Sequence, residues 1–312
     1  MEHFNRDLTL TSSETAALLD VHPSTVKRWC NDGELRFDAT SGGHRRIHLD
    51  DAVEFSRERG IRTVLSPFHP YEPHVWTGLQ ELRQKESFKS LHQLAMGWIV
   101  RGQIRRLGLL FDAMAREPSV SLVHFVDEGI GGLMERVGVA WAEGRLRVAE
   151  EHLVSQAMVE VLLRLTRSRD AEAPTDRLPT AVVGTMEGNQ HHLGALSVRI
   201  LLERRGWDVS YLGPDVPVED FAAIQRSREA ALVCISLPPP AAAGDVARVV
   251  RVLGDLYDAG RPYALAIGGQ FGAEMEPSLM TGAFTRVDTF TSLAAFASGL
   301  EAGFAPAAVE AA

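Results

Sequence analysis

From residue 178 to about residue 304, short apolar runs alternate with segments of helical periodicity. The apolar runs are residues 180–186, 207–212, 230–237, 263–268 and about 284–289. Bounded apolar runs of this length predict buried strands. Strands that alternate with helices form a parallel sheet covered on both faces, because each parallel connection needs a crossover. Right-handed crossovers then predict a flavodoxin-like α/β fold for residues 178–304.

Three of these strands end in polar or small residues. The first is followed by a polar loop that contains His191, and then by a helix that begins near Gly194. His191 therefore lies at the carboxyl end of a parallel strand, where ligands bind in open α/β sheets. An imidazole there can present one ring nitrogen to a metal while a neighbour holds the other. Two later strands end in Ser236–Leu237 and Gly268–Gly269.

The pattern His191-x-x-Gly194, with Asn189 two residues before the histidine, resembles the D-x-H-x-x-G motif of cobalamin-binding domains. The pairs Ser236–Leu237 and Gly268–Gly269 are similar to two later motifs of that family. There the histidine replaces the cofactor's own lower base on cobalt, and the nucleotide tail threads beside the serine and the glycines. The resemblance implies that His191 is the cobalt ligand. A plain flavodoxin-like domain with a surface histidine is the alternative.

The partner of His191 departs from the family pattern. Asn189 stands where an acid is usual, so it can orient the ring but cannot act as a carboxylate partner. Glu187 is the alternative partner.

Residues 1–63 have the pattern of a winged helix-turn-helix domain. Capping residues from Thr11 to Glu14 predict the start of a first helix, and Pro23 suits the first turn of a second. Strands expected at residues 35–37 and 44–47 flank the turn Ser41-Gly42-Gly43 and form a wing, after which a third helix begins near Asp50.

Polar and basic residues occupy the two elements that such a domain presents to DNA. The second helix offers four side chains to a major groove: Ser24, Thr25, Lys27 and Arg28. The wing offers three to flanking phosphates: His44, Arg45 and Arg46. The spacing of Trp29, Gly33 and Leu35, followed by the wing, resembles winged helix-turn-helix domains of the MerR and excisionase type. A solvated cationic face is the alternative.

Residues 64–75 contain three prolines, so we expect a semi-extended linker in which His69 and His74 have no fixed scaffold. Residues 76–170 carry apolar residues three and four positions apart in four segments, which predicts a four-helix bundle. The segments are Leu91–Trp98, Leu107–Met114, Val123–Val137 and Leu153–Leu165.

Near the end of this region, Trp141 is followed by the pair Glu151–His152. The spacing W-x9-E-H resembles the signature of the light-responsive, adenosylcobalamin-binding regulators of the CarH/LitR family. The resemblance implies that the bundle covers the corrin, that Trp141 lies against the upper axial group, and that Glu151 and His152 contact the adenosyl group. The alternative is a core tryptophan and a surface pair.

The residue after the signature tryptophan also departs from the family. Ala142 stands where the best-known members have a histidine that becomes the upper ligand after illumination. His152, water or no protein ligand are the alternatives.

The resemblance spans almost the whole chain of 312 residues. It implies a transcription regulator, not an enzyme, that represses by binding double-stranded operator DNA as an adenosylcobalamin-loaded homo-oligomer, a tetramer, in the dark. Light-driven cleavage of the cobalt–carbon bond would then release the DNA. A light-independent corrinoid sensor and a corrinoid-carrying module of a methyltransferase are the alternatives.

The composition indicates how strongly the protein can bind DNA and in which cellular compartment we expect it. The net charge is −9, so one copy should bind DNA weakly and several copies together tightly. Two distant cysteines, Cys30 and Cys234, predict a reducing compartment and no disulfide. We see neither a signal sequence nor an apolar run that could span a bilayer, so we expect a cytoplasmic protein without a membrane partner.

Overall fold

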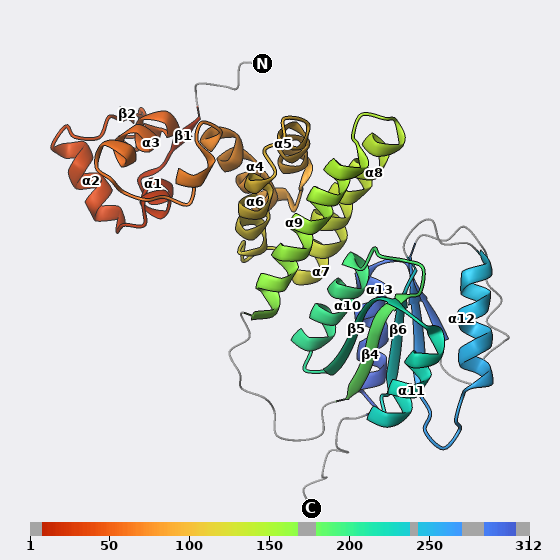
Figure 1. The fold of residues 1–312 in the computed structure, drawn as a ribbon. Helices are drawn as coiled ribbons and strands as arrows, with labels where there is room; N and C mark the ends of the chain where they lie inside the picture. The colour runs from red at the N-terminus through yellow and green to blue at the C-terminus, as the bar shows by residue number, and fades with distance from the viewer. Residues whose placement is uncertain (1–7, 168–178, 238–242, 270–283, 304–312) are drawn as a thin grey trace, which may run out of the picture. The chain divides into compact units, whose positions relative to one another are not determined.

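The computed structural model describes residues 8–167, 179–237, 243–269 and 284–303. The chain divides into two compact units (Figure 1). The first unit comprises residues 1–120 and 135–150, and the second comprises residues 121–134 and 151–312. Each is described by itself. In the ranges given above, none of the helices combines the length and the apolar character that a membrane span requires.

The first unit begins with a small helix-turn-helix domain. Its elements are β1 (Thr9–Leu10), α1 (Ser12–Leu19), α2 (Pro23–Asn31), β2 (Asp38–Ala39), β3 (Arg45–His48) and α3 (Leu49–Glu58). Thr11 and Glu14 form a capping box at the start of α1, and Pro23 occupies the first turn of α2 as predicted. The strands pair antiparallel in the order β1-β3-β2. The wing is therefore present, and β1 adds a strand that the sequence did not predict.

The first wing strand lies later than predicted, at residues 38–39 instead of 35–37. The reason is the end of α2. The N–H groups of Glu34 and Leu35 both donate to the carbonyl oxygen of Trp29, and the Leu35 side chain is buried. Leu35 therefore completes the helix end and the core before the wing begins.

Residues 64–75 are not an extended linker, and that prediction is wrong. Ser66–Phe68 form a 3₁₀ helix, η1, and the next helix, α4, already begins at Glu72. Leu65 and Phe68 are buried. Proline is tolerated in the first turn of a helix, and prolines occupy that position in both η1 and α4. Pro67 and Pro73 thus mark helix starts, whereas Pro70 lies between the two helices.

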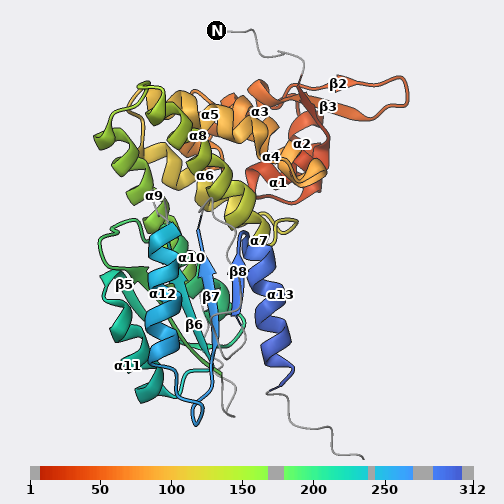
Figure 2. The same cartoon turned by 90° about the vertical axis from the view of Figure 1, so that its right-hand side faces the viewer.

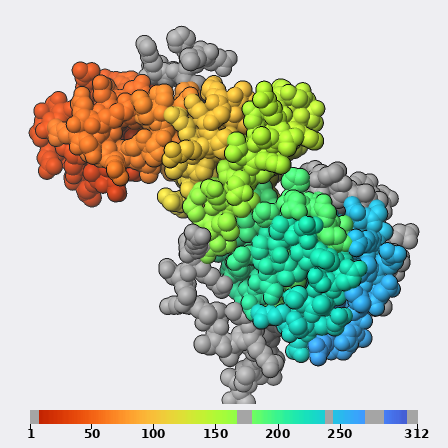
Figure 3. Space-filling model, viewed as in Figure 1, coloured from red at the N-terminus to blue at the C-terminus, as the bar shows by residue number. Residues whose placement is uncertain are grey.

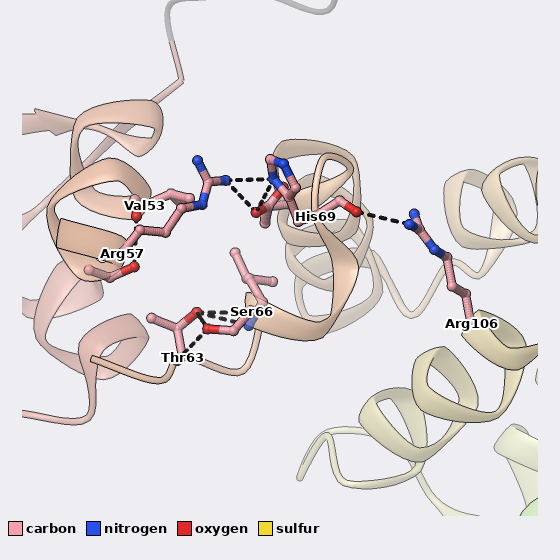
Figure 4. Close-up of polar contacts among 9 residues, drawn as sticks. Val53, Arg57, Thr63, Ser66, His69 and Arg106 are labelled. Carbon is pink, nitrogen blue, oxygen red and sulfur yellow. Dashed lines mark hydrogen bonds and ion pairs between the residues drawn. The ribbon is translucent and has the colours of Figure 1, made fainter. Parts of the chain in front are cut away.

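A cluster of polar side chains holds this segment to its neighbours (Figure 4). We call Arg57, His69, Glu72 and Arg106 the Glu72 junction. Arg57 Nη2 donates to Glu72 Oε1 at 2.5 Å, and His69 Nδ1 lies 3.2 Å from the same oxygen. Arg106 Nη2 donates to the carbonyl oxygen of His69 at 2.9 Å. His69 therefore has a fixed environment, contrary to expectation, and so does His74, whose pKa is lowered by burial.

The helices after the junction include all four that the sequence predicts. They are α4 (Glu72–Lys85), α5 (Lys89–Val100), α6 (Arg105–Ala115), α7 (Leu122–His124), the π-helical segment η2 (Phe125–Gly131), α8 (Gly132–Ala142) and α9 (Val148–Arg167). The segments α7, η2 and α8 form one continuous helical run. The helix α4 is additional. In the core of the first unit, Trp98 stacks against Phe68 with ring centroids 6.1 Å apart.

The second unit contains a five-stranded parallel sheet in the order β5-β4-β6-β7-β8 (Figure 2). The strands are β4 (Thr180–Met186), β5 (Asp208–Val216), β6 (Leu232–Ser236), β7 (Ala264–Gly268) and β8 (Phe284–Val287). The helices are α10 (Leu193–Arg204), α11 (Val218–Arg228), α12 (Ala243–Asp255) and α13 (Phe290–Glu301). This strand order is that of flavodoxin-like folds, so the predicted fold class is confirmed.

Two hydrophobic layers hold the sheet between its helices. One layer joins alternate residues of the central strands, such as Val183 and Cys234, to α10 and α13. The other joins the intervening residues, such as Val182 and Val233, to α11 and α12. In the space-filling view the sheet and its covering helices form a rounded body coloured green to blue (Figure 3). Cys30 and Cys234 are free and buried, and burial raises the pKa of both thiols.

Candidate functional site

The carboxyl ends of β4, β6 and β7 bring the predicted motifs side by side. Thr185 of β4 pairs with Ser236 of β6, which pairs with Gly268 of β7. Paired residues of neighbouring parallel strands point to the same face. This is the face that α10 and α13 cover, since the preceding alternate residues belong to that layer. Small and hydroxyl-bearing residues thus follow the buried apolar layer at this edge.

The glycines of the motifs are explained by close approach of the backbone. A Cβ atom on Gly194, in the first turn of α10, would lie 3.0 Å from Ser236 Oγ. Gly269 has a φ of 139°, and a Cβ atom there would lie only 2.0 Å from the carbonyl oxygen of Leu237. The Leu237 N–H in turn donates to the carbonyl oxygen of Gly268 at 2.7 Å. No side chain fits at Gly269, so that glycine is required by packing alone.

The sequence did not single out Thr185, although the structure places it beside Ser236. Its side chain is fully buried, and its Oγ1 atom has no hydrogen-bond partner within the described ranges. A buried hydroxyl without a partner costs about 1–3 kcal/mol. Such a group at the carboxyl edge of the sheet is suited to bind a polar atom of a ligand. The available signal was a hydroxyl side chain near the end of an otherwise apolar strand.

The loop that carries His191 is held by side chains of its own and of β5. Asn189 Oδ1 accepts from the backbone N–H of His191 at 3.0 Å, so Asn189 fixes the backbone of the loop at His191. Glu187 forms an ion pair with Arg248 of α12. Glu187 is therefore engaged away from His191, and the alternative partner that the sequence offered is not supported.

Asp215 of β5 is the main support of this loop, and the sequence did not identify it. Its carboxylate accepts from the Gly188 N–H at 2.8 Å and from Gln190 Nε2 at 3.1 Å. Its own N–H donates to the carbonyl oxygen of Asn189 at 3.2 Å. Asp215 has a φ of 60°, a conformation that is uncommon outside glycine and that often marks functional loops. No local pattern indicates such a contact between loop and strand.

His191 forms a cluster with Glu151 and His152 of α9, which we call the His191 cluster. The rings of His152 and His191 have centroids 6.5 Å apart and are oriented edge to face. His152 Nε2 lies 3.5 Å from Glu151 Oε2, and one ligand atom of each residue lies within 4.8 Å of the others. The structure thus brings together three residues that the sequence selected separately. Imidazole and carboxylate are ligands for cobalt, zinc and related ions.

Trp141 lies at the end of α8 in the part assigned to the first unit. Its side chain is 50% exposed, and that of Val139 is 49% exposed. The alternative that Trp141 is a core residue is therefore wrong. An exposed indole is available for contact with a ligand.

The predicted DNA-contacting residues differ in how freely they can move. Ser24, Lys27, Arg28 and His44 are exposed, whereas Thr25, Arg45 and Arg46 are half-buried. Arg45 Nη2 donates to Asn31 Oδ1 at 2.6 Å, and its guanidinium lies over the Phe37 ring at 5.3 Å. Arg45 therefore ties the wing to the end of α2. Trp29 packs against Phe55 with centroids 4.9 Å apart, as expected for a residue of the domain core.

Three models of known families match separate stretches of the chain. Residues 9–59 match a helix-turn-helix domain family. Residues 98–166 and residues 179–290 match two B12 binding domain families.

Among individual relatives, the HTH-type transcriptional repressor CarA of Myxococcus xanthus is 32% identical over 282 residues, which cover 84% of this chain and 87% of CarA. The repressor CarH of the same organism is 36% identical over 95 residues, or 30% of each chain. The dimethylamine corrinoid protein 2 of Methanosarcina mazei is 30% identical over 113 residues, which cover 36% of this chain and 53% of that protein. This chain spans about half the length of the dimethylamine corrinoid proteins it matches.

Among solved structures, the monomethylamine corrinoid protein of Methanosarcina barkeri superposes with a TM-score of 0.50 at 17% identity. The match covers 65% of this chain and 95% of that one. At this identity the match establishes a shared fold.

Proposed function

This chain belongs to the family of HTH-type transcriptional repressors that includes CarA and CarH, and from that premise we propose that it is a B12-dependent photoreceptor that regulates transcription. The helix-turn-helix and B12 binding domain matches describe a B12-binding transcription regulator. The proposal adds that the cofactor is adenosylcobalamin and that the loaded form assembles in the dark as a tetramer on double-stranded operator DNA. Illumination then releases the DNA.

The observation that carries the proposal is the arrangement at the carboxyl ends of β4, β6 and β7. His191 is exposed on a loop that Asp215 and Asn189 hold in place. Behind it, Gly194 allows α10 to approach Ser236, and the Thr185 hydroxyl has no hydrogen-bond partner among the described residues. These residues fit cobalamin, because an imidazole is available for cobalt and hydroxyl groups are available for a polar tail.

The residues then have separate roles in the proposal. His191 would bind cobalt from below, and its ring orientation would depend on Asp215 through the loop. When bound, adenosylcobalamin supplies a cobalt–carbon bond that light can cleave. Trp141, Glu151 and His152 would contact the adenosyl group, so their contacts would distinguish the dark form from the illuminated form.

DNA binding in this proposal depends on assembly. In the N-terminal domain, Lys27 and Arg28 of α2 are exposed and can reach a major groove, while Arg45 holds the wing against the helix. Because the chain has a net charge of −9, a single copy has little electrostatic attraction for DNA. Several copies on repeated operator elements gain affinity through effective concentration. The state of assembly can therefore control repression.

A light-independent corrinoid sensor is the second candidate. Ala142 favours it, because this position lacks the histidine that the resemblance would require as an upper ligand after illumination. His152 is an imidazole near His191 that could take that role.

The deciding experiment combines absorption spectroscopy, size-exclusion chromatography and operator binding. The cobalamin-loaded protein would be compared before and after green light. We expect the dark spectrum of a histidine-ligated cobalamin, an irreversible spectral change, a smaller particle and loss of operator binding. A bound but light-inert oligomer would establish the second candidate. Absence of cobalamin binding would refute both.

Two variants test the residue assignments. His191→Ala should abolish the histidine-ligated spectrum, while His192→Ala, at the neighbouring position, should retain it. Arg46→Ala combined with Arg45→Ala should weaken operator binding and reduce its salt dependence, because phosphate contacts release counterions. An unchanged salt dependence would remove the wing from the DNA interface.

A further inference from the structure

We propose that the His191 cluster binds a divalent transition-metal ion, with zinc as the preferred ion, when the protein holds no cobalamin. The metal site itself depends only on the cluster, whereas its competition with cobalamin rests on the proposed function. Within the described ranges, these residues are the one group of three or more histidine, cysteine, aspartate and glutamate side chains that lie close enough together to share an ion.

The donor set matches zinc. Two imidazoles and one carboxylate form a common three-residue ligand set for zinc, with a water molecule as fourth ligand. Donor atoms around a tetrahedral zinc ion are roughly 3.4 Å apart, given bond lengths of about 2.1 Å. In the structure the three donor atoms lie within 4.8 Å of one another, and His152 Nε2 is already 3.5 Å from Glu151 Oε2. Small side-chain rotations therefore close the site, and the exposure of His152 and His191 permits them.

A further contact prepares the carboxylate. Ser155, one helical turn after Glu151, donates its hydroxyl hydrogen to Glu151 Oε1 at 2.5 Å. This bond leaves Oε2 facing His152. Hydrogen bonds that orient a ligand in this way commonly support metal sites.

The charge of the cluster also favours a cation. In the described part of the chain, no lysine or arginine forms an ion pair with Glu151. The contrast is Glu187, at the start of the loop that carries His191, which Arg248 neutralises. A divalent ion would supply the positive charge that Glu151 lacks.

Binding of the metal would exclude cobalamin. The imidazole of His191 cannot give the same nitrogen lone pair to two metal ions. A bound zinc ion would also join the start of α9 to the loop after β4, so both segments would have to separate before cobalamin could bind. The protein would then respond to the ratio of corrinoid to free zinc.

The test uses the full chain, produced without cobalamin and freed of metal ions by a chelator. Cobalt(II) chloride serves as a spectroscopic probe, and zinc chloride is titrated by calorimetry. We expect saturable binding of one ion per chain, a visible spectrum typical of four-coordinate cobalt(II), and displacement by zinc. His152→Ala and Glu151→Gln should each weaken binding by about 100-fold or more, and Ser155→Ala by about 10-fold. His192→Ala is the matched control and should bind as the unchanged protein does.

The outcomes separate the two proposals. Equal zinc affinity in His152→Ala, or no saturable binding, would overturn the metal site, and thermal unfolding of each variant would verify that it folds. Zinc added before adenosylcobalamin should slow cobalamin binding in the unchanged protein and not in His152→Ala. Zinc binding without any cobalamin binding would refute the proposed function and leave the metal site standing. Simultaneous binding of both would refute the shared use of His191.

Discussion

The Glu72 junction and the His191 cluster contain the same kinds of residue but differ in what surrounds the carboxylate. Glu72 is 2% exposed and is paired with Arg57, whereas Glu151 is 18% exposed and lies beside His152 and Ser155. The histidines hardly differ, since His69 is 63% and His152 is 65% exposed. Exposure of a histidine therefore does not distinguish a structural contact from a binding site. The feature that differs between the two regions is an arginine fixed beside the carboxylate, which Glu72 has.

The physical reason lies in the cost of burying charge. A buried carboxylate needs a partner, because removal from water costs several kcal/mol. Once Arg57 has supplied the charge, the oxygen atoms of Glu72 have little left to offer a ligand. Glu151 is only partly shielded, and within the described ranges its Oε2 atom is paired with His152 and with no lysine or arginine, so it can still bind a ligand or ion.

The largest effect that we predict is on the Glu72 junction. Arg57→Ala would leave a buried carboxylate without its cation, so the free energy of unfolding of the first unit should fall by about 3 kcal/mol. Urea unfolding followed by tryptophan fluorescence measures it, because Trp98 is fully buried there. The control is Arg59→Ala, which removes an exposed pair with Glu34 and should cost less than about 1 kcal/mol. Equal losses in both variants would contradict the comparison.

The opposite pattern is expected at the His191 cluster. His191→Ala should change the free energy of unfolding by no more than about 0.5 kcal/mol, because the side chain is exposed. Cobalamin affinity should fall by more than about 100-fold, since the proposed cobalt ligand is lost. Equilibrium dialysis measures the affinity. A large loss of stability in His191→Ala with intact cobalamin binding would mean that His191 stabilises the fold and does not bind the cofactor.

A smaller effect is expected at the support of the cluster. Asp215→Ala removes two hydrogen bonds to the loop, so cobalamin affinity should fall by about 10-fold to 100-fold without loss of the ligand itself. Asp208→Ala is a matched control on the same strand, because it removes an exposed carboxylate that pairs with Arg228 instead. If both variants bind cobalamin equally well, Asp215 has no positioning role.

The smallest effect concerns a paired carboxylate at the far end of α13. Burial alone would raise the pKa of Glu301, but hydrogen bonds from Arg205 and Trp207 outweigh it and lower the pKa below the ordinary value of 4.5. The folded state therefore holds the Glu301 proton less tightly than the unfolded state does. Its stabilisation is present above about pH 4.5 and is lost as the pH falls through the lowered pKa.

Glu301→Gln should accordingly reduce the free energy of unfolding at pH 7 by about 1 kcal/mol or less, and by still less at pH 3. Urea unfolding at both pH values checks this result. Glu219→Gln is the control, because it removes a more exposed carboxylate that lies 4.0 Å from Arg248, and at pH 7 it should cost less than Glu301→Gln does. A pH-independent loss in Glu301→Gln would mean that packing, not charge, is responsible.

Local patterns in the sequence predicted the sheet and the meeting of its motifs. Residues 180–186 form a strand with the predicted bounds, because the apolar run has no competing helical period. The proximity of Ser236 and Gly268 followed from the rule that the carboxyl ends of parallel strands share one edge. The position of His191 followed in the same way.

Contacts that depend on packing between distant segments could not be predicted. Glu151 and His191 meet only because α9 passes the loop after β4, and nothing in either segment encodes that approach. Asp215 supports the loop from another strand. The three prolines of residues 64–75 were misjudged because proline both interrupts a chain and starts a helix, and the burial of Phe68 decides between these.

The Glu72 junction also affects which spacings between operator half-sites the proposed oligomer could bind. When helix-turn-helix domains are joined to an oligomer by flexible linkers, they tolerate variable spacing between the half-sites in the DNA. Here Arg57 of α3 is bound to Glu72 of α4, and Arg106 of α6 donates to the carbonyl oxygen of His69 between them, so these contacts restrain rotation of the DNA-binding domain against the helices. In the proposed oligomer, the distance between the recognition helices of different copies would then be fixed. Operator repeats would have to keep the phase of the double helix, and an insertion of half a turn would place the second site on the wrong side of the DNA.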